Sequence, residues 1–177
     1  MTSQSPVAER ILGIDPGSRL TGFGIIDVTG QQTVYIASGA VNCSHGTLPE
    51  RLLLIFQSIS EIVAQYQPHT VVVESVFMHR NAGSALKLGQ ARAAAMCATF
   101  SVDAKVHEYA PREIKQAVVG NGGASKEQVQ HMVSSLLALD GDPSADAADA
   151  LAAALCHAQH QRMKQRLAGI AAVAGER

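Results

Sequence analysis

The order in which hydrophobic periodicities follow one another constrains this sequence most. Three short segments, residues 11–15, 20–28 and 33–41, have the apolar and β-branched composition of strands, and Gly30 lies in the turn between the last two. Strand-like and helical segments then alternate along the rest of the chain. Three strands in a meander followed by this alternation predict an α/β fold: a mixed five-stranded sheet, an antiparallel meander then parallel strands, with helices on both faces.

The helical segments have clear start signals. A capping box at residues 47–50 opens a helix whose apolar residues recur at helical spacing until Pro68, and a second capping box at residues 125–128 opens another. The remaining predicted strands are residues 70–74 and 105–109, and the remaining predicted helices are residues 82–100, 111–115 and 144–166. We expect a folded core from about residue 11 to 160 and mobile ends. The mobile carboxyl-terminal end is expected to begin at about residue 167.

Composition excludes several classes of protein. With 47% apolar and 16% charged residues in 177, the chain is not of the disordered class. No apolar stretch approaches the roughly 20 residues that span a bilayer, so no membrane partner is expected. Charged residues around residues 9–15 do not suit a signal peptide. Three cysteines without a CxxC pair indicate reduced thiols and a cytoplasmic protein.

The charge is unevenly distributed. The net charge of −1 argues against a nonspecific polycationic nucleic-acid binder. Between residues 79 and 126, however, seven lysines and arginines face only three acids. This basic segment leaves DNA or RNA open as a partner.

Four acidic residues stand in apolar segments, where an unpaired carboxylate is costly to bury. Asp15 and Glu74 each end a predicted strand, and Asp146 and Asp149 share one face at the start of a helix. Structural roles compete with catalysis: Asp15 suits a turn stabiliser and Asp146 suits the helix dipole. For Glu74 the structural and the catalytic roles are about equally supported. The helix dipole explains Asp149 less well than it explains Asp146.

These four acids could converge at one edge of the sheet. Four close carboxylates repel one another unless divalent cations neutralise them, and hard oxygen ligands suit Mg²⁺ or Mn²⁺. A pair of such ions can activate water and stabilise the leaving oxygen in phosphodiester cleavage. The residues alone make this one hypothesis among others.

The sequence also resembles a known family. The segments ILGIDPGSRLTGFGII, VVVESVFMHRNAGSALKLGQARA, VHEYAPREIKQAVVGNGGASKEQVQHMV and DPSADAADALAAALCHA, in this order, are similar to those of the RuvC family of Holliday-junction resolvases. The resemblance extends from about residue 11 to 157. It implies one ribonuclease-H-like nuclease domain over residues 1–177, with the first ten residues and the tail outside the match.

The resemblance implies roles for particular residues. Asp15, Glu74, Asp146 and Asp149 match the family's catalytic, metal-binding acids, although the fourth position is not always Asp in the family. Lys115 and Lys126 match residues that contact the phosphate backbone. Phe77 matches an aromatic that stacks on bases at the branch point, and Arg80 joins the expected DNA-binding residues.

The implied activity is that of a crossover junction endodeoxyribonuclease. It would resolve four-way DNA junctions by paired, symmetric nicks during homologous recombination and DNA repair. Mg²⁺ is the implied cofactor, with Mn²⁺ as a possible substitute and two ions per subunit. A homodimer formed through residues 85–95 and the RuvA–RuvB branch-migration complex are the implied partners.

Two other functions are weighed. A noncatalytic junction-binding domain would usually have lost some of the acids that this chain retains. An ATPase fragment of the actin/Hsp70 type would share the Asp-Pro-Gly-Ser turn, but 177 residues leave no room for the second phosphate motif. His157 and His160 are interpreted as an exposed helix face rather than a metal pair, and residues 162–166 as a solvated helix end.

Overall fold

The computed structural model describes residues 8–75 and 81–175. Phe77 and Arg80 lie outside these residues. The strands are β1 (Glu9–Asp15), β2 (Leu20–Thr29), β3 (Gln32–Asn42), β4 (Thr70–Glu74) and β5 (Lys105–Tyr109). The helices are α1 (Leu48–Tyr66), α2 (Ala82–Ala98), α3 (Pro111–Val119), α4 (Lys126–Leu137) and α5 (Ala145–Gly175), with a 3₁₀ turn at Thr99–Ser101.

The strands form one mixed sheet in the order β3-β2-β1-β4-β5. The first three strands pair antiparallel, whereas β4 runs parallel to both β1 and β5. This confirms the predicted fold class and places the carboxyl ends of β1 and β4 side by side.

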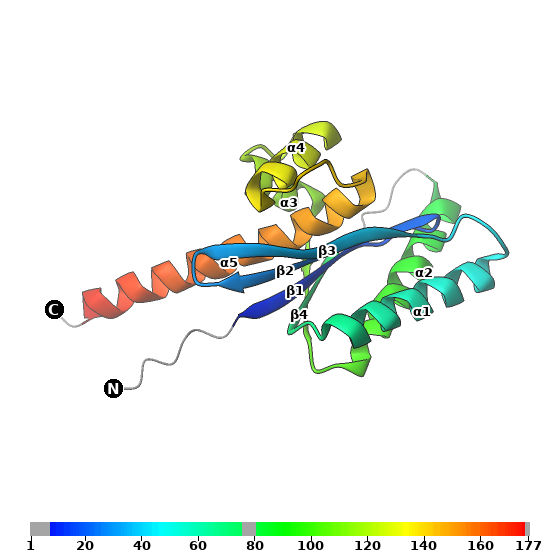
Figure 1. Cartoon of the computed structure of the whole chain (residues 1–177), viewed down its shortest axis with the longest axis horizontal. Helices are drawn as coiled ribbons and strands as arrows, with labels where there is room; N and C mark the ends of the chain where they lie inside the picture. Colours follow the sequence, from blue (N-terminus) through cyan, green and yellow to red (C-terminus); the bar gives the residue numbers. More distant parts are fainter. Residues whose placement is uncertain (1–7, 76–80, 176–177) are drawn as a thin grey trace.

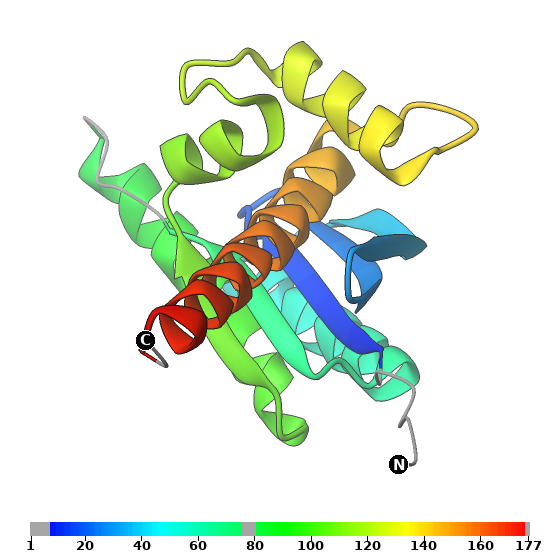
Figure 2. The same cartoon turned by 90° about the vertical axis from the view of Figure 1, so that its left-hand side faces the viewer.

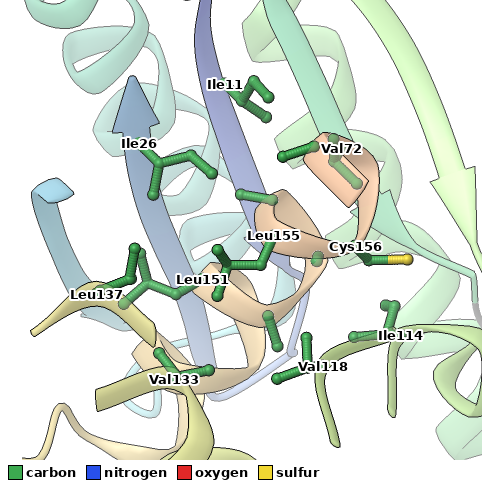
Figure 3. Packing of buried hydrophobic residues seen from close by; sticks show 14 of the residues in the cluster. Ile11, Ile26, Val72, Ile114, Val118, Val133, Leu137, Leu151, Leu155 and Cys156 are labelled. Carbon is green, nitrogen blue, oxygen red and sulfur yellow. The ribbon is translucent and has the colours of Figure 1, made fainter. Parts of the chain in front are cut away.

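Helices cover both faces of the sheet (Figures 1 and 2). Side chains alternate along each strand, so Leu12 and Ile14 of β1 face α1 and α2, whereas Ile11 faces the side covered by α5. On this second side, Leu151 and Leu155 of α5 fill the space between the strands and helices α3 and α4 (Figure 3). Two hydrophobic layers therefore hold the sheet, and α5 lies centrally in one of them.

Helix α5 lies unusually close to β1 and β2 because glycines line its path. A Cβ atom added to Gly13 would overlap the carbonyl oxygen of Ala150, and one added to Gly24 would overlap Leu151. These two glycines face each other in the β1–β2 ladder. The missing side chains thus fix the depth of α5 on the sheet, and with it the position of the acids at the start of α5.

Two expected helix ends in the carboxyl-terminal half were wrong. Helix α3 continues to Val119, beyond the predicted end at residue 115, because Val118 joins the core. Helix α5 continues to Gly175, beyond the predicted end near residue 166. Alanines in this segment favour helix, and the single Gly169 does not interrupt it.

Two side chains of α5, Arg162 and His157, were also interpreted wrongly, whereas Lys164 and Arg166 are exposed as expected. Arg162 donates to the carbonyl oxygen of Gly30 at 3.1 Å and to Thr33, so it clamps the β2–β3 turn rather than facing solvent. His157 is only 3% exposed, and its Nδ1 lies 2.9 Å from the Tyr109 hydroxyl.

Among the described helices, none combines the length and apolarity needed to cross a membrane.

Candidate active site

Two of the predicted acids lie at neighbouring strand ends. Ile14 of β1 pairs in register with Val73 of β4, so the residues that follow them, Asp15 and Glu74, end adjacent parallel strands at the same edge. Apolar residues precede both carboxylates and anchor the strands in the core. Each carboxylate is half-buried.

The other two acids reach this edge on α5. Gly22, which pairs with Asp15 across the β1–β2 ladder, contacts the backbone of Asp146 so closely that an added Cβ would overlap its carbonyl oxygen. Asp149 follows about one turn later on the same helix face and is also half-buried. The structure therefore brings together all four acids that the sequence singled out.

Their electrostatics reflect this proximity. Burial, followed by the charges of Glu74, Asp149 and Asp146, raises the pKa of Asp15 to about 7. Burial and the Asp149 charge also raise the pKa of Glu74. Each raised pKa means that the folded chain disfavours the charged carboxylate unless a cation compensates it.

Lys126 supplies part of this compensation. Its Nζ lies 3.1 Å from Oδ2 of Asp149, and this contact raises the pKa of the lysine. The Ser125–Gln128 capping box begins α4 beside the acids, with Ser125 N donating to Gln128 Oε1 at 2.9 Å. Lys126 is the first residue of this helix, so the cap positions its side chain next to the site.

Lys115 of α3 lies near the same site but has a different partner. Its charge partly offsets the rise in the pKa of Glu74, while its Nζ donates to the carbonyl oxygen of Ala124 at 2.7 Å. Both lysines expected to contact DNA thus border the acids. Phe77 and Arg80, the other two expected DNA-binding residues, lie outside the described residues and stay predictions.

The donor set fits hard divalent cations. Carboxylate oxygens are the ligands that Mg²⁺ and Mn²⁺ prefer, and the raised pKa of Asp15 indicates uncompensated negative charge. Within the described ranges, no three acidic, histidine or cysteine side chains are yet arranged to hold an ion. Asp149 is engaged by Lys126 instead.

Sequence reasoning missed the residues that set the geometry. Gly22 and Gly24 occupy alternate positions of β2 and therefore share one face, a pattern that indicates close approach of another backbone. This signal was available in the sequence. The Lys126–Asp149 ion pair had no comparable signal, because 23 residues separate its partners.

Comparison with known proteins identifies the family. The family model for crossover junction endodeoxyribonuclease RuvC matches residues 11–157. The chain is 56% identical to the protein of that name from Aromatoleum aromaticum, over 89% of this chain and 85% of the relative. It is 55% identical to the one from Aliivibrio fischeri, over 90% of this chain and 92% of the relative.

Two solved structures resemble the fold of this chain. Thermus thermophilus RuvC in complex with a Holliday junction substrate superposes with a TM-score of 0.82 at 35% identity, covering 88% of this chain and 96% of that one. The yeast mitochondrial Holliday junction resolvase superposes with a TM-score of 0.63 at 12% identity, covering 93% of this chain and 86% of that one. This second likeness concerns the fold alone.

Proposed function

This chain belongs to the RuvC family of crossover junction endodeoxyribonucleases, and we propose that it resolves four-way DNA junctions by paired, symmetric, Mg²⁺-dependent nicks. Such nicks would serve homologous recombination and DNA repair. The ATPase alternative has no remaining basis, because the family model spans the Asp-Pro-Gly-Ser turn and the chain up to residue 157.

One observation carries the catalytic part of the proposal. Four acids from β1, β4 and α5 meet at one sheet edge, and burial and mutual repulsion raise the pKa of Asp15 to about 7. Uncompensated carboxylates at a fixed position are costly to a fold and are found where they bind cations or do chemistry. Asp15, Glu74, Asp146 and Asp149 would therefore hold the metal.

The chain and its cofactor would divide the chemistry between them. Bound divalent cations, two per subunit in this proposal, would supply an activated water and neutralise charge on the departing 3′ oxygen. The rigid attachment of the acids to strand ends and to the start of α5 would fix the reacting phosphate. Lys115 and Lys126 would bind neighbouring phosphates, while Phe77 would stack on an opened base and Arg80 would contact the backbone.

The proposed assembly is a homodimer on the junction. Two subunits related by a twofold axis would place two equivalent sites on strands of like polarity, as paired nicks require. We also propose that residues 1–177 act as one nuclease domain in the cytoplasm, where the RuvA–RuvB complex would supply junctions. The three cysteines, free among the described residues, suit that compartment.

The test compares substrates under one set of conditions. End-labelled four-way junction and linear duplex of the same sequence are incubated with the chain in Mg²⁺ or in EDTA and separated on a denaturing gel. We expect symmetric nicks in the junction only, and only with Mg²⁺. Equal cleavage of the linear duplex would contradict the structure selectivity.

The Lys126–Asp149 ion pair favours a second candidate, a noncatalytic junction-binding domain, because it engages one of the four acids. This candidate predicts junction binding without nicking in both Mg²⁺ and Mn²⁺. The same gel decides between the two functions.

A further inference from the structure

The Lys126–Asp149 contact joins two groups with very different surroundings. The Asp149 side chain is 20% exposed and lies among the other acids, whereas the Lys126 side chain is 67% exposed. Lys126 extends from the first turn of α4, a different element from those that carry the acids. The ammonium group therefore enters the acidic site from its solvent side.

We propose that Lys126 is a positioning residue that holds Asp149 before a divalent cation binds and then exchanges this carboxylate for a DNA phosphate. The inference rests on the proposed function, because it concerns the same metal site. Junction nicking alone does not require this role, in which the Lys126 side chain and the metal compete for the Asp149 carboxylate.

Competition follows from charge and from the shared ligand atom. Oδ2 of Asp149 accepts from Lys126 at 3.1 Å, and a metal ligand must offer its oxygen to the cation instead. An ammonium group left beside a bound dication would also be repelled by it. Release costs little, because the lysine is largely exposed and its flexible stem can return the ammonium group to water.

The released ammonium group then becomes available to DNA. Once a cation holds the Asp149 oxygen, the N–H donors of Lys126 lose that acceptor, and a backbone phosphate can take its place. Metal binding would therefore switch Lys126 from an internal ion pair to a phosphate contact, and DNA binding would in turn favour metal binding. This reciprocity separates the proposal from a purely structural ion pair.

Lys115 is a matched control within the chain. It carries the same charge and partly offsets the rise in the pKa of Glu74, but its ammonium group donates to the carbonyl oxygen of Ala124 at 2.7 Å. Neutralising Lys115 removes charge from the surroundings without freeing a carboxylate oxygen. Any difference from Lys126 therefore measures direct competition.

The first experiment measures metal affinity without DNA. Mn²⁺ is titrated into the wild type and the variants, and free Mn²⁺ is quantified by electron paramagnetic resonance. We expect Lys126→Gln to bind Mn²⁺ about fivefold more tightly than the wild type, because a charged competitor is removed. Lys115→Gln should change the affinity by less than about twofold, and Lys126→Arg should stay near the wild type because it keeps a cationic partner.

The second experiment follows the released lysine. Junction affinity is measured by fluorescence anisotropy over a range of salt concentrations, in EDTA and in Ca²⁺, a hard cation that takes the same oxygen ligands. Each phosphate contact contributes about one unit to the slope of log affinity against log salt. We expect Lys126→Gln to reduce the slope by about one unit in Ca²⁺ and to leave it unchanged in EDTA.

The outcomes separate this inference from the proposed activity. Equal Mn²⁺ affinities for Lys126→Gln and Lys115→Gln, or equal slope changes with and without metal, would overturn the exchange while leaving junction nicking intact. Absence of Mn²⁺ binding in every variant would overturn both the exchange and the metal site. The gel assay decides the nuclease activity independently.

Discussion

At the scale of single residues, the Asp15 carboxylate is costly to keep charged, because burial and three neighbouring carboxylates raise its pKa to about 7. A carboxyl group whose pKa is raised on folding lowers stability as pH rises from its ordinary value, 3.8, through about 7. Asp15→Asn should therefore increase the free energy of unfolding in EDTA at pH 8 by about 1–2 kcal/mol, after allowance for partial solvent exposure. The same variant should lose its nicking activity, because it lacks one of the proposed metal-binding carboxylates.

Urea unfolding and a nicking assay check this trade-off between stability and activity. Asp103→Asn is the control, because it removes an exposed acid on the loop before β5 and should change neither quantity. A destabilised Asp15→Asn variant would mean that this carboxylate supports the fold rather than the site.

His157 gives a separate pH dependence. Burial, followed by the nearby His107, lowers its pKa to about 4, with Glu9 opposing and Lys164 and His160 assisting. A histidine with a depressed pKa contributes stability above its ordinary value of 6.5, and this is lost as pH falls toward about 4. The loss should reach roughly 2–3 kcal/mol.

Urea unfolding of the wild type and His157→Gln at pH 7 and pH 4 measures this contribution. The glutamine variant should lose less stability over the interval, because its amide does not titrate. His45→Gln, at an exposed position, should follow the wild type. Parallel curves for all three proteins would show that His157 is not the group responsible.

Individual residues also show how far sequence reasoning reaches. Asp15 and Glu74 could be selected because each ends a buried apolar strand, and strand ends are readable from local pattern. The burial of His157 could not be read in this way, because it depends on contact with Tyr109 from a different element. The roles of the four acids and of Lys115, Lys126, Phe77 and Arg80 remain predictions until variants are assayed.

At the scale of elements, the packing of α5 on β1 and β2 determines where the acids lie. Gly22→Ala would place a methyl group on the carbonyl oxygen of Asp146, so α5 must move or β2 must bend. We expect a loss of about 2–3 kcal/mol in unfolding free energy and at least a tenfold loss of nicking rate. Gly141→Ala is the matched control, because nothing lies near its added methyl group.

The nicking rate distinguishes displacement of the site from simple destabilisation. It is measured at a temperature where both variants remain folded by circular dichroism. Wild-type nicking by a folded Gly22→Ala variant would contradict the view that this contact positions Asp146.

Element boundaries were predictable where local signals are strong. The strands and α1 follow apolar runs and a capping box, and their observed bounds differ from the predicted ones by no more than two residues. Helix α5 lacks such a stop signal, because its alanines continue the helix and tertiary contacts from Arg162 anchor it to the β2–β3 turn. Its length could therefore not be read from periodicity.

At the scale of the whole molecule, α2 has an exposed side on which the proposed homodimer would form. One side of α2 buries Ala91 and Ala95 against the core, while its other side lines a groove with Gly89 and Ala93 beside Leu86, which is 67% exposed. We predict that the chain sediments as a dimer at micromolar concentration and that Leu86→Glu makes it monomeric. Met163→Glu, exposed on α5 across the sheet, should stay dimeric.

The global fold was predictable because several signals agreed. A meander of three strands, then alternation, specifies the sheet, and apolar faces on both sides specify two helical layers. The convergence of the acids followed only as a possibility, since periodicity gives no distances between elements. The structure shows how the acids come together: Gly22 contacts the backbone of Asp146, and the register of β1 with β4 places Asp15 beside Glu74.

The most direct test of the central claim is the single-turnover nicking rate of a labelled four-way junction as Mg²⁺ is varied, for the wild type and Asp146→Asn. Junction binding is measured in the same samples. We predict Mg²⁺-dependent nicking by the wild type and a loss of at least a hundredfold in Asp146→Asn, with binding retained. Equal rates for the two proteins, or nicking that persists in EDTA, would contradict a metal-dependent site built from these acids.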